Sequence, residues 1–231
     1  VALTRNFSLE AGGVASRVSV DGRGAGTLNP LGNPDNVTQV YSVYGGPTFA
    51  TQAGDLSINA AYRAGYTKVE SKDNVALPAG QQRFDQFDDS VSQLATASVG
   101  MQPGKLPFGW AVSGSWERED AGQLDTRFDG KYARADVTVP VSPTVALVGG
   151  VGYEDIEISE RDALRDARGV PIVGSNGRLV TDPASPRLVA YQEDGLIWDA
   201  GVLWRPSPRT SLEARYGRRY GPDTYIGSLS Y

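Results

Sequence analysis

The chain of 231 residues contains no cysteine, no histidine and a single methionine. Without cysteine it forms no disulfide and offers no thiolate nucleophile or Cys-ligated zinc or iron–sulfur site. Without histidine it has no Ser–His or Cys–His nucleophile pair and no His-ligated metal. The sequence also shows no cofactor motif. We therefore expect no cofactor and no metal centre.

Long apolar runs are also missing: none approaches the roughly 20 residues that a membrane-spanning helix needs. Lys and Arg number 22 against 27 Asp and Glu, a net charge of −5, which argues against a nucleic-acid partner. The chain starts at Val1 without a basic segment followed by an apolar one, so we expect any signal peptide to be absent from this numbering. Its 28 glycines and 11 tyrosines favour strands and tight turns over helices.

Apolar and polar residues alternate along most of the chain. Between Trp110 and Glu117, for example, the even positions are apolar or glycine and the odd positions are mostly polar. A period of two predicts strands with one apolar and one polar face. In the first segment the parity changes at Gly12–Gly13, which predicts a β-bulge. That bulge would put Leu3, Phe7 and Leu9 on one face with Val14, Val18 and Val20. The predicted strands lie near residues 3–20, 37–51, 56–70, 90–101, 110–119, 128–141, 145–158, 195–205, 211–220 and 224–231.

The connections between these segments alternate in length. Residues 52–55, 102–109, 142–144 and 206–210 are short, and between them lie mostly longer, polar connections at 21–36, 70–89, 120–127 and 159–194. In an up-and-down meander all short turns fall at one end, as in outer-membrane barrels. We therefore expect an all-β fold: a transmembrane up-and-down antiparallel β-barrel with about ten strands in this chain. A soluble barrel or sandwich with its apolar faces inside is the alternative.

Residues 1–231 are expected to form one outer-membrane barrel domain, either a whole barrel or part of a larger one. Charges in the middle of the polar faces would then face the lumen, as a plug of ion pairs or as the lining of an aqueous path. Aromatics near strand ends of the apolar faces would lie at the lipid interfaces. The predicted lumen residues are Glu10, Arg63, Glu117, Arg134, Asp136, Glu154, Asp199, Glu213, Arg215 and Arg219. The predicted interface aromatics are Tyr66, Trp110, Trp116, Tyr153, Trp198, Trp204 and Tyr231.

A catalytic site is the less favoured interpretation of the acidic residues near the strand ends. Glu117, Glu119 and Asp120 at one rim, and Asp155, Glu157 and Glu160 near another, could supply the carboxylate pair that glycoside hydrolysis needs. The simpler interpretation is a solvated acidic rim, so we expect no enzymatic activity. The long connection at 159–194 contains a predicted hairpin around residues 174–177 and is the candidate for binding a partner.

Several stretches carry a family resemblance: Pro206 to Leu212, Arg215 to Gly221, and Gly227 to Tyr231. Together they resemble the PEP-CTERM-system-associated outer-membrane β-barrel family of Gram-negative bacteria. Some relatives carry the label of a preprotein translocase accessory subunit, although that subunit resembles a small protein with one spanning helix. The resemblance implies a link to envelope or exopolysaccharide and carries over no catalytic residue.

The expected function is therefore a non-enzymatic pore or export component of the bacterial outer membrane. The alternative is a structural barrel whose long extracellular loops bind a partner or surface polymer. The expected partners are the lipid bilayer, the outer-membrane assembly machinery and polysaccharide or other envelope proteins, with no nucleic acid.

Overall fold

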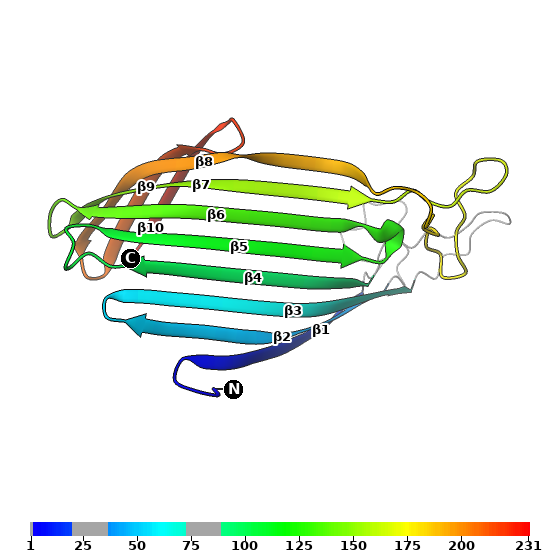
Figure 1. The fold of residues 1–231 in the computed structure, drawn as a ribbon, viewed down its shortest axis with the longest axis horizontal. Coiled ribbons are helices and arrows are strands. Elements are labelled where there is room, and N and C mark those ends of the chain that lie inside the picture. The colour runs from blue at the N-terminus through cyan, green and yellow to red at the C-terminus, as the bar shows by residue number, and fades with distance from the viewer. Residues whose placement is uncertain (1, 20–36, 73–88) are drawn as a thin grey trace.

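The computed structural model describes residues 2–19, 37–72 and 89–231. They form one antiparallel sheet of ten strands, each paired with the next along the chain (Figure 1). This is the up-and-down meander that the alternation predicted. The strands are β1 Phe7–Ser19, β2 Val37–Ala53, β3 Leu56–Lys72, β4 Ser90–Met101, β5 Gly109–Ala121, β6 Arg127–Pro140, β7 Val145–Glu160, β8 Leu188–Ser207, β9 Thr210–Arg218 and β10 Asp223–Ser230.

The largest difference from the predicted boundaries concerns β8, which begins at Leu188 and not near residue 195. Its first residues pair with the last part of β7, and the register shifts between Ile158 and Ser159. The shift leaves Ala190 without a partner on β7, so the alternation along β8 changes there. The sequence pattern missed the beginning of the strand because Gln192 and Asp194 are polar residues at outer-face positions and the alternation changes at Ala190.

The bulge predicted at Gly12–Gly13 is wrong. Every residue of β1 pairs with one residue of β2 in unbroken register, so Phe7 and Leu9 lie on the opposite face from Val14. Val20 lies outside the described residues. Gly12 has a different role, because a Cβ there would lie 2.6 Å from Cζ of Tyr44. The glycine makes room for the tyrosine ring of the neighbouring strand.

The sheet is curved, and its C-terminal strands curl behind β5–β7 (Figure 1). Two ion pairs join strands that are not neighbours: Arg63 on β3 with Glu10 on β1, and Arg134 on β6 with Asp199 on β8. Side chains two strands apart approach each other on the concave side of a curved sheet, so these ion pairs identify the concave face. We call this the inner face and the opposite one the outer face. In the described residues β1 pairs only with β2 and β10 only with β9, so the sheet is not closed.

The predicted segregation of the connections by length holds only in part, because residues 122–126 and 219–222, at the same end as the long connection 161–187, are shorter than residues 102–108 at the opposite end. Short turns join β2 to β3, β4 to β5, β6 to β7 and β8 to β9 at one end of the sheet. Residues 122–126, which include the 3₁₀ turn η1 (Gln123–Asp125), and residues 161–187 lie at the other end (Figure 1). The predicted connections at 21–36 and 70–89 fall largely outside the described residues. In the described part of the chain no helix is long and apolar enough to cross a membrane.

Candidate functional site on the inner face

The strand register places the predicted lumen charges on one face. Directly paired residues point to the same side of a sheet, and the ladders from β5 to β10 connect Glu117, Asp136, Glu154, Asp199 and Glu213 to inner-face positions. Arg134 and Arg215 lie on the same face, as do Glu10 and Arg63 on the N-terminal strands. Arg219 follows β9 and reaches the inner face by its contact with Glu154.

The central group is a chain of ion pairs across β6, β8 and β9. Nη2 of Arg134 lies 2.5 Å from Oδ2 of Asp199, and Nη1 of Arg215 lies 2.9 Å from Oδ1 of the same carboxylate. Nε of Arg134 also donates to Asp136 at 2.8 Å, and Nε of Arg215 donates to Glu213. The side chains of Arg134 and Asp199 are each only 13% exposed. We call these five residues the Asp199 cluster; one carboxylate bridges two guanidinium groups at its centre.

Glycines on the intervening and neighbouring strands make the Asp199 cluster possible. A Cβ on Gly150 of β7 would lie 2.3 Å from Nη2 of Arg134 and 2.4 Å from Oδ1 of Asp136. A Cβ on Gly217 of β9 would lie 2.7 Å from Cβ of Asp199. Any larger residue at these positions would occupy the space of the charged side chains. The glycines seen in the sequence therefore have a packing role at this site.

A second inner-face group joins β7 to the β9–β10 turn. Arg219 donates to both carboxylate oxygens of Glu154, at 3.0 and 2.8 Å, and Glu154 is 8% exposed. The hydrogen bond to Glu154 raises the pKa of Arg219, so the guanidinium stays charged. Burial raises the pKa of the adjacent Tyr220 phenol, which keeps it neutral. The pair is bidentate, a geometry that holds both groups firmly.

The remaining inner-face charges are separate from these groups. Nη2 of Arg63 lies 2.8 Å from Oε2 of Glu10, and the guanidinium sits over the ring of Tyr44 with 5.7 Å to its centroid. Within the described residues Glu117 has no ion-pair partner. The structure therefore distributes the predicted lumen charges over three groups of ion pairs and one isolated carboxylate, rather than one continuous network.

A pocket of about 170 Å³ opens between the two C-terminal groups. Arg134, Arg215 and Arg219 line it together with Tyr132 and Thr224. Each of the three arginines already has a carboxylate partner. The predicted lumen residues comprise four arginines and six carboxylates, so this set carries an excess of negative charge.

The carboxylates considered for hydrolysis are distributed over both faces of the sheet. Glu117 and Glu119 lie on the inner face, whereas Asp120 lies on the outer face and pairs with Arg127 at 2.5 Å. Asp155 and Glu157 are both on the outer face, and Asp155 contacts Lys131. In residues 2–19, 37–72 and 89–231 no group of three or more Asp or Glu side chains is placed to hold a metal ion.

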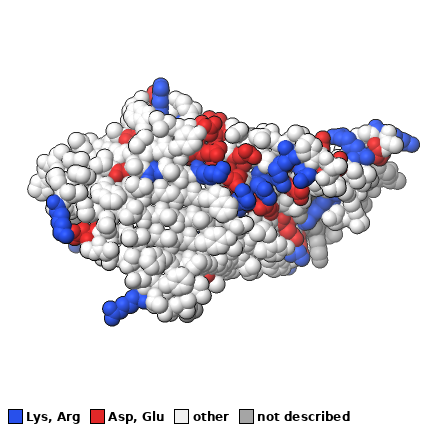
Figure 2. All heavy atoms as spheres, viewed as in Figure 1, with Lys and Arg blue, Asp and Glu red and all other residues white. Residues whose placement is uncertain are grey.

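The outer face is apolar from the short-turn end to well beyond the middle of the sheet. Figure 2 shows few charges over that part and a concentration of them toward the long connections. The register puts every predicted interface aromatic that lies in a strand on this face. Trp110 and Trp204 lie near the short turns, and Tyr231 follows the end of β10. The other four lie farther along their strands, away from the short turns: Tyr66, Trp116, Tyr153 and Trp198.

A row of outer-face charges lies next to these aromatics, on the side of the long connections; the sequence analysis named only Asp120 and Asp155 of this row, as rim carboxylates. Arg118 contacts Asp129 at 2.5 Å and covers the ring of Trp116, with 5.2 Å to its centroid. Tyr153 donates a hydrogen bond to Asp194, and Tyr66 donates one to Asp89. The alternation could have predicted this row, because these charged residues occupy the sequence positions of the apolar face in the same strands. The row comprises Arg118, Asp120, Arg127, Asp129, Lys131, Asp155 and Asp194.

Residues 161–187 form a folded loop with internal threefold regularity. Leu164, Ile172 and Val180 recur at equal spacing, and their backbones form a ring: each N–H donates to the carbonyl of another, over 2.7 to 3.0 Å. The predicted hairpin is the second of three turns, closed by the bridge between Val173 and Leu179. A ring of backbone bonds gives this loop its own scaffold.

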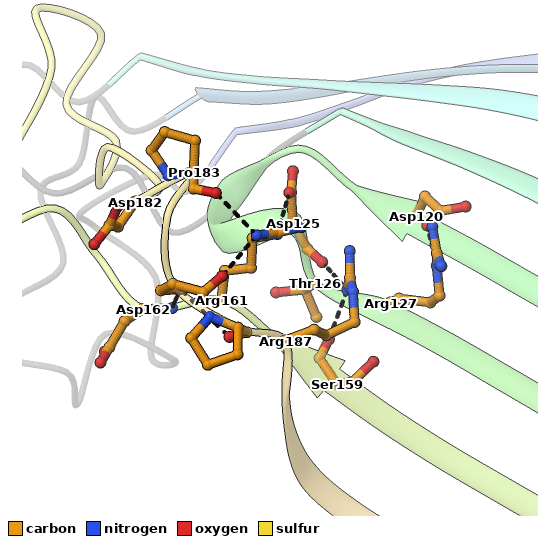
Figure 3. A network of polar contacts seen from close by, with 12 residues as sticks. Asp120, Asp125, Thr126, Arg127, Ser159, Arg161, Asp162, Asp182, Pro183 and Arg187 are labelled. Carbon is orange, nitrogen blue, oxygen red and sulfur yellow. Dashed lines mark hydrogen bonds and ion pairs between the residues drawn. The ribbon is translucent and has the colours of Figure 1, made fainter.

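Two arginines fasten the loop to the rest of the structure (Figure 3). Nη1 of Arg161 donates to the carbonyls of Pro183 and Ser185 at 3.2 and 2.6 Å. Its Nε lies 3.1 Å from the carboxylate of Asp125 in η1. Arg187 donates to the carbonyl of Asp125 from the other end of the loop. The loop is thus fixed over the β5–β6 connection at both of its ends.

Comparisons with known proteins support the fold. No protein-family model and no curated protein sequence matches the chain. Its structure is similar to the crystal structure of the ferric-catecholate import receptor Fiu from E. coli K12 in its open form, with a TM-score of 0.53 and 13% sequence identity. The match covers 96% of this chain and 46% of the receptor chain. The chain therefore has the all-β, up-and-down antiparallel fold of an outer-membrane β-barrel protein, and spans less than half the length of that receptor.

Proposed function

We propose that this chain is part of the wall of a transmembrane barrel in the outer membrane of a Gram-negative bacterium, and that its inner face lines an aqueous path. The observation that carries the proposal is the separation of the two faces. The outer face exposes large apolar residues such as Val112, Val151 and Leu196, whereas the inner face holds the ion-paired charges. A soluble β-protein would bury the apolar face.

The height of the apolar zone supports this placement. On β3 the outer-face residues from Leu56 to Tyr66 are apolar. Ten residue steps at roughly 3.3 Å each, with a strand tilt of about 40°, span about 25 Å along the membrane normal. That matches the apolar band of about 25 Å in outer-membrane barrels. The aromatic and charged rows above it would then lie in the outer headgroup region.

The proposed role is passive passage of a solute or an exported polymer. The excess of carboxylates on the inner face favours cations over anions in such a path. The resemblance to the PEP-CTERM-associated family connects the path with envelope or exopolysaccharide. Fiu is a ferric-catecholate import receptor, and at 13% identity its likeness supports the architecture and not the substrate. We propose no catalytic role.

Purification from outer membranes and reconstitution into planar bilayers test this function. We expect the protein to fractionate with the outer membrane and to give steady single-channel currents with a modest preference for cations. A protein that is soluble without detergent would refute the membrane placement. A membrane-inserted protein that carries no current at any applied voltage would refute the aqueous path.

A structural barrel whose extracellular loop binds a partner is the second candidate function. The backbone ring of residues 161–187 and their attachment through Arg161 and Arg187 favour it, because a loop fixed before binding loses little conformational entropy on binding. Val170 at one of its turns is 56% exposed. An electrically silent barrel that retains binding to the cell-surface polymer, and loses it when residues 163–185 are deleted, would support this candidate over the pore.

A further inference from the structure

The pocket of about 170 Å³ on the inner face is lined by polar groups that the ion pairs do not use. Arg134 donates from Nε and Nη2, and Arg215 donates from Nε and Nη1. Each of these guanidinium groups keeps one Nη that makes no hydrogen bond to the described residues. The hydroxyls of Tyr132 and Thr224 in the lining likewise have no hydrogen-bond partner in that part of the chain. Side chains from β6, β9 and β10 thus offer hydrogen bonds to a ligand in one cavity.

The charges around the pocket are already paired, and this restricts the ligand. Three arginines of the lining contact four carboxylates, and a further arginine of the lining, Arg218, pairs with Asp223. An anion would have to displace one of these carboxylates, and a cation would meet the guanidinium groups. An uncharged ligand with several hydroxyls avoids both costs, because a hydroxyl accepts a hydrogen bond from a guanidinium and donates one to a carboxylate. The first seven residues are Arg134, Arg215, Arg219, Asp136, Asp199, Glu213 and Glu154.

The pocket also has apolar surface and the size of a sugar ring. Ile197 and Ile226 line it together with the ring of Tyr132. A pyranose presents C–H groups on its faces and hydroxyls around its rim, so it needs apolar side chains and a few polar groups together. A volume of 170 Å³ corresponds to about six water molecules at roughly 30 Å³ each, which is room for one such ring.

Tyr132 lines a second, larger space as well, a groove of about 430 Å³ formed by β2–β6. The register pairs Tyr132 with Ser115 and Ser115 with Thr96, so the groove lies on the inner face. Among the described residues no charged one lines it. Its polar lining consists of hydroxyl and amide side chains: Thr48, Asn59, Thr96, Ser98, Ser113 and Ser115. The pocket and the groove therefore meet at one aromatic side chain, and both suit an uncharged, hydroxylated ligand.

We infer that this part of the inner face binds an uncharged saccharide chain, with one ring in the pocket and neighbouring rings in the groove on the other side of Tyr132. The inference names a substrate class for the function proposed above. It rests on that function, because a chain in the periplasm or outside the cell reaches the inner face only if this face lines an aqueous path.

Isothermal titration calorimetry of the full chain in lauryldimethylamine oxide, a detergent without a sugar, tests the inference. The probes are maltohexaose and cellohexaose as neutral chains, glucose as a single ring and hexagalacturonate as an acidic chain. We expect at least one neutral chain to bind more tightly than glucose and than hexagalacturonate. Failure of both neutral chains to bind, or tighter binding of the acidic chain, would overturn the inference. Equal affinities of glucose and the neutral chains would refute the role of the groove.

Two variants with matched controls locate the site. Tyr132→Ala should weaken binding about tenfold because the ring between pocket and groove is lost. Thr224→Val should weaken it about threefold because one hydroxyl is lost, and it keeps the test valid if Tyr132→Ala does not fold. Phe128→Ala and Thr138→Val are the controls, since both residues lie on the same face of β6 outside the pocket and the groove. Variants that bind no more weakly than their controls would refute the site.

Current measurements in planar bilayers separate this inference from the proposed function. If both are correct, the neutral chain that binds should block the open-channel current, and the block should weaken in Tyr132→Ala. A conducting protein that binds no saccharide would refute the inference alone. A protein that binds the chain but carries no current would refute the aqueous path and leave the binding site in place.

Discussion

The guanidinium of Arg134 on β6 crosses Gly150 of β7 to reach the carboxylate of Asp199 on β8, with 2.5 Å between Nη2 and Oδ2. The middle strand contributes no side chain at the crossing point. This arrangement fixes the relative positions of three consecutive strands from the inner side. It also joins the two arginines of the Asp199 cluster through one carboxylate.

Replacing Gly150 by alanine tests this packing directly. The new Cβ would lie 2.3 Å from Nη2 of Arg134, so the arginine must leave Asp199 or the strands must separate. We expect the free energy of unfolding to fall by about 1–3 kcal/mol, measured by urea denaturation in detergent. Gly195→Ala is the matched control on β8, because no atom lies within 4 Å of the Cβ it adds. Equal stability of the two variants would contradict the packing role of Gly150.

Replacing Asp199 by asparagine separates electrostatic from structural effects. The variant leaves Arg134 and Arg215 without their shared counter-ion, so we expect a loss of about 1–3 kcal/mol in stability and a shift of ion selectivity toward anions. Glu117→Gln removes the same charge from the same face but breaks no ion pair in the described structure. We expect it to shift selectivity in the same direction with unchanged stability. Reversal potentials in a salt gradient and urea denaturation give the two readouts.

If Glu117→Gln destabilises the protein as much as Asp199→Asn, the division of the inner-face charges into separate groups is wrong. If neither variant changes the reversal potential, the inner face does not line the conducting path.

A lysine in the apolar zone distinguishes lipid from water on the outer face. Val151 lies on the outer face of β7 and is 49% exposed. In a bilayer, Val151→Lys should destabilise the folded protein by about 2–4 kcal/mol. Glu157→Lys on the same face of the same strand, in the charged region, should cost less than about 1 kcal/mol. Stability is measured by denaturation of the protein in lipid vesicles, and equal small costs would indicate a solvated outer face.

Replacing Arg161 by alanine should weaken the attachment of one end of the loop at 161–187 to η1, where the backbone N–H of residue 161 still donates to the carbonyl of Leu124 at 2.8 Å. The variant loses the contact with Asp125 and two hydrogen bonds to carbonyls. We expect subtilisin to cut the loop several-fold faster, whereas the unfolding of the strands stays unchanged because the loop is outside the sheet. Arg168→Ala removes an exposed arginine side chain of the same loop that makes no ion pair or hydrogen bond in the described structure; the backbone N–H of residue 168 still donates to Asp166. Equal cleavage rates of the two variants would show that Arg161 does not hold the loop.

The period-two pattern predicted most of the fold because the sheet is a single layer. Each strand residue faces either the outer or the inner side, so its polarity follows directly from its position in the alternation. Local alternation was sufficient to assign the strands and their faces. In β5, for example, Trp110 and Trp116 mark the apolar face and Glu117 the polar face, and in β8 Asp199 marks the polar face. In the first part of β8 the pattern fails, because Gln192 and Asp194 are polar at outer-face positions and the register shifts between Ile158 and Ser159. At Gly12 the pattern predicted a β-bulge that is not present. The sequence alone does not distinguish a glycine at a bulge from a glycine that makes room for the ring of Tyr44.

The sequence by itself determined the strands, their order and the polarity of their two faces, because these follow from local alternation and connection length. It left undetermined which charge pairs with which. Arg134 and Asp199 are distant in sequence and lie on strands that are not neighbours, so only the curvature of the sheet brings them together. The outer-face charged row and the loop fastened by Arg161 likewise depend on contacts between different hairpins. Local periodicity specifies the strands and their two faces, whereas the curvature of the folded sheet determines which side chains on non-neighbouring strands come into contact.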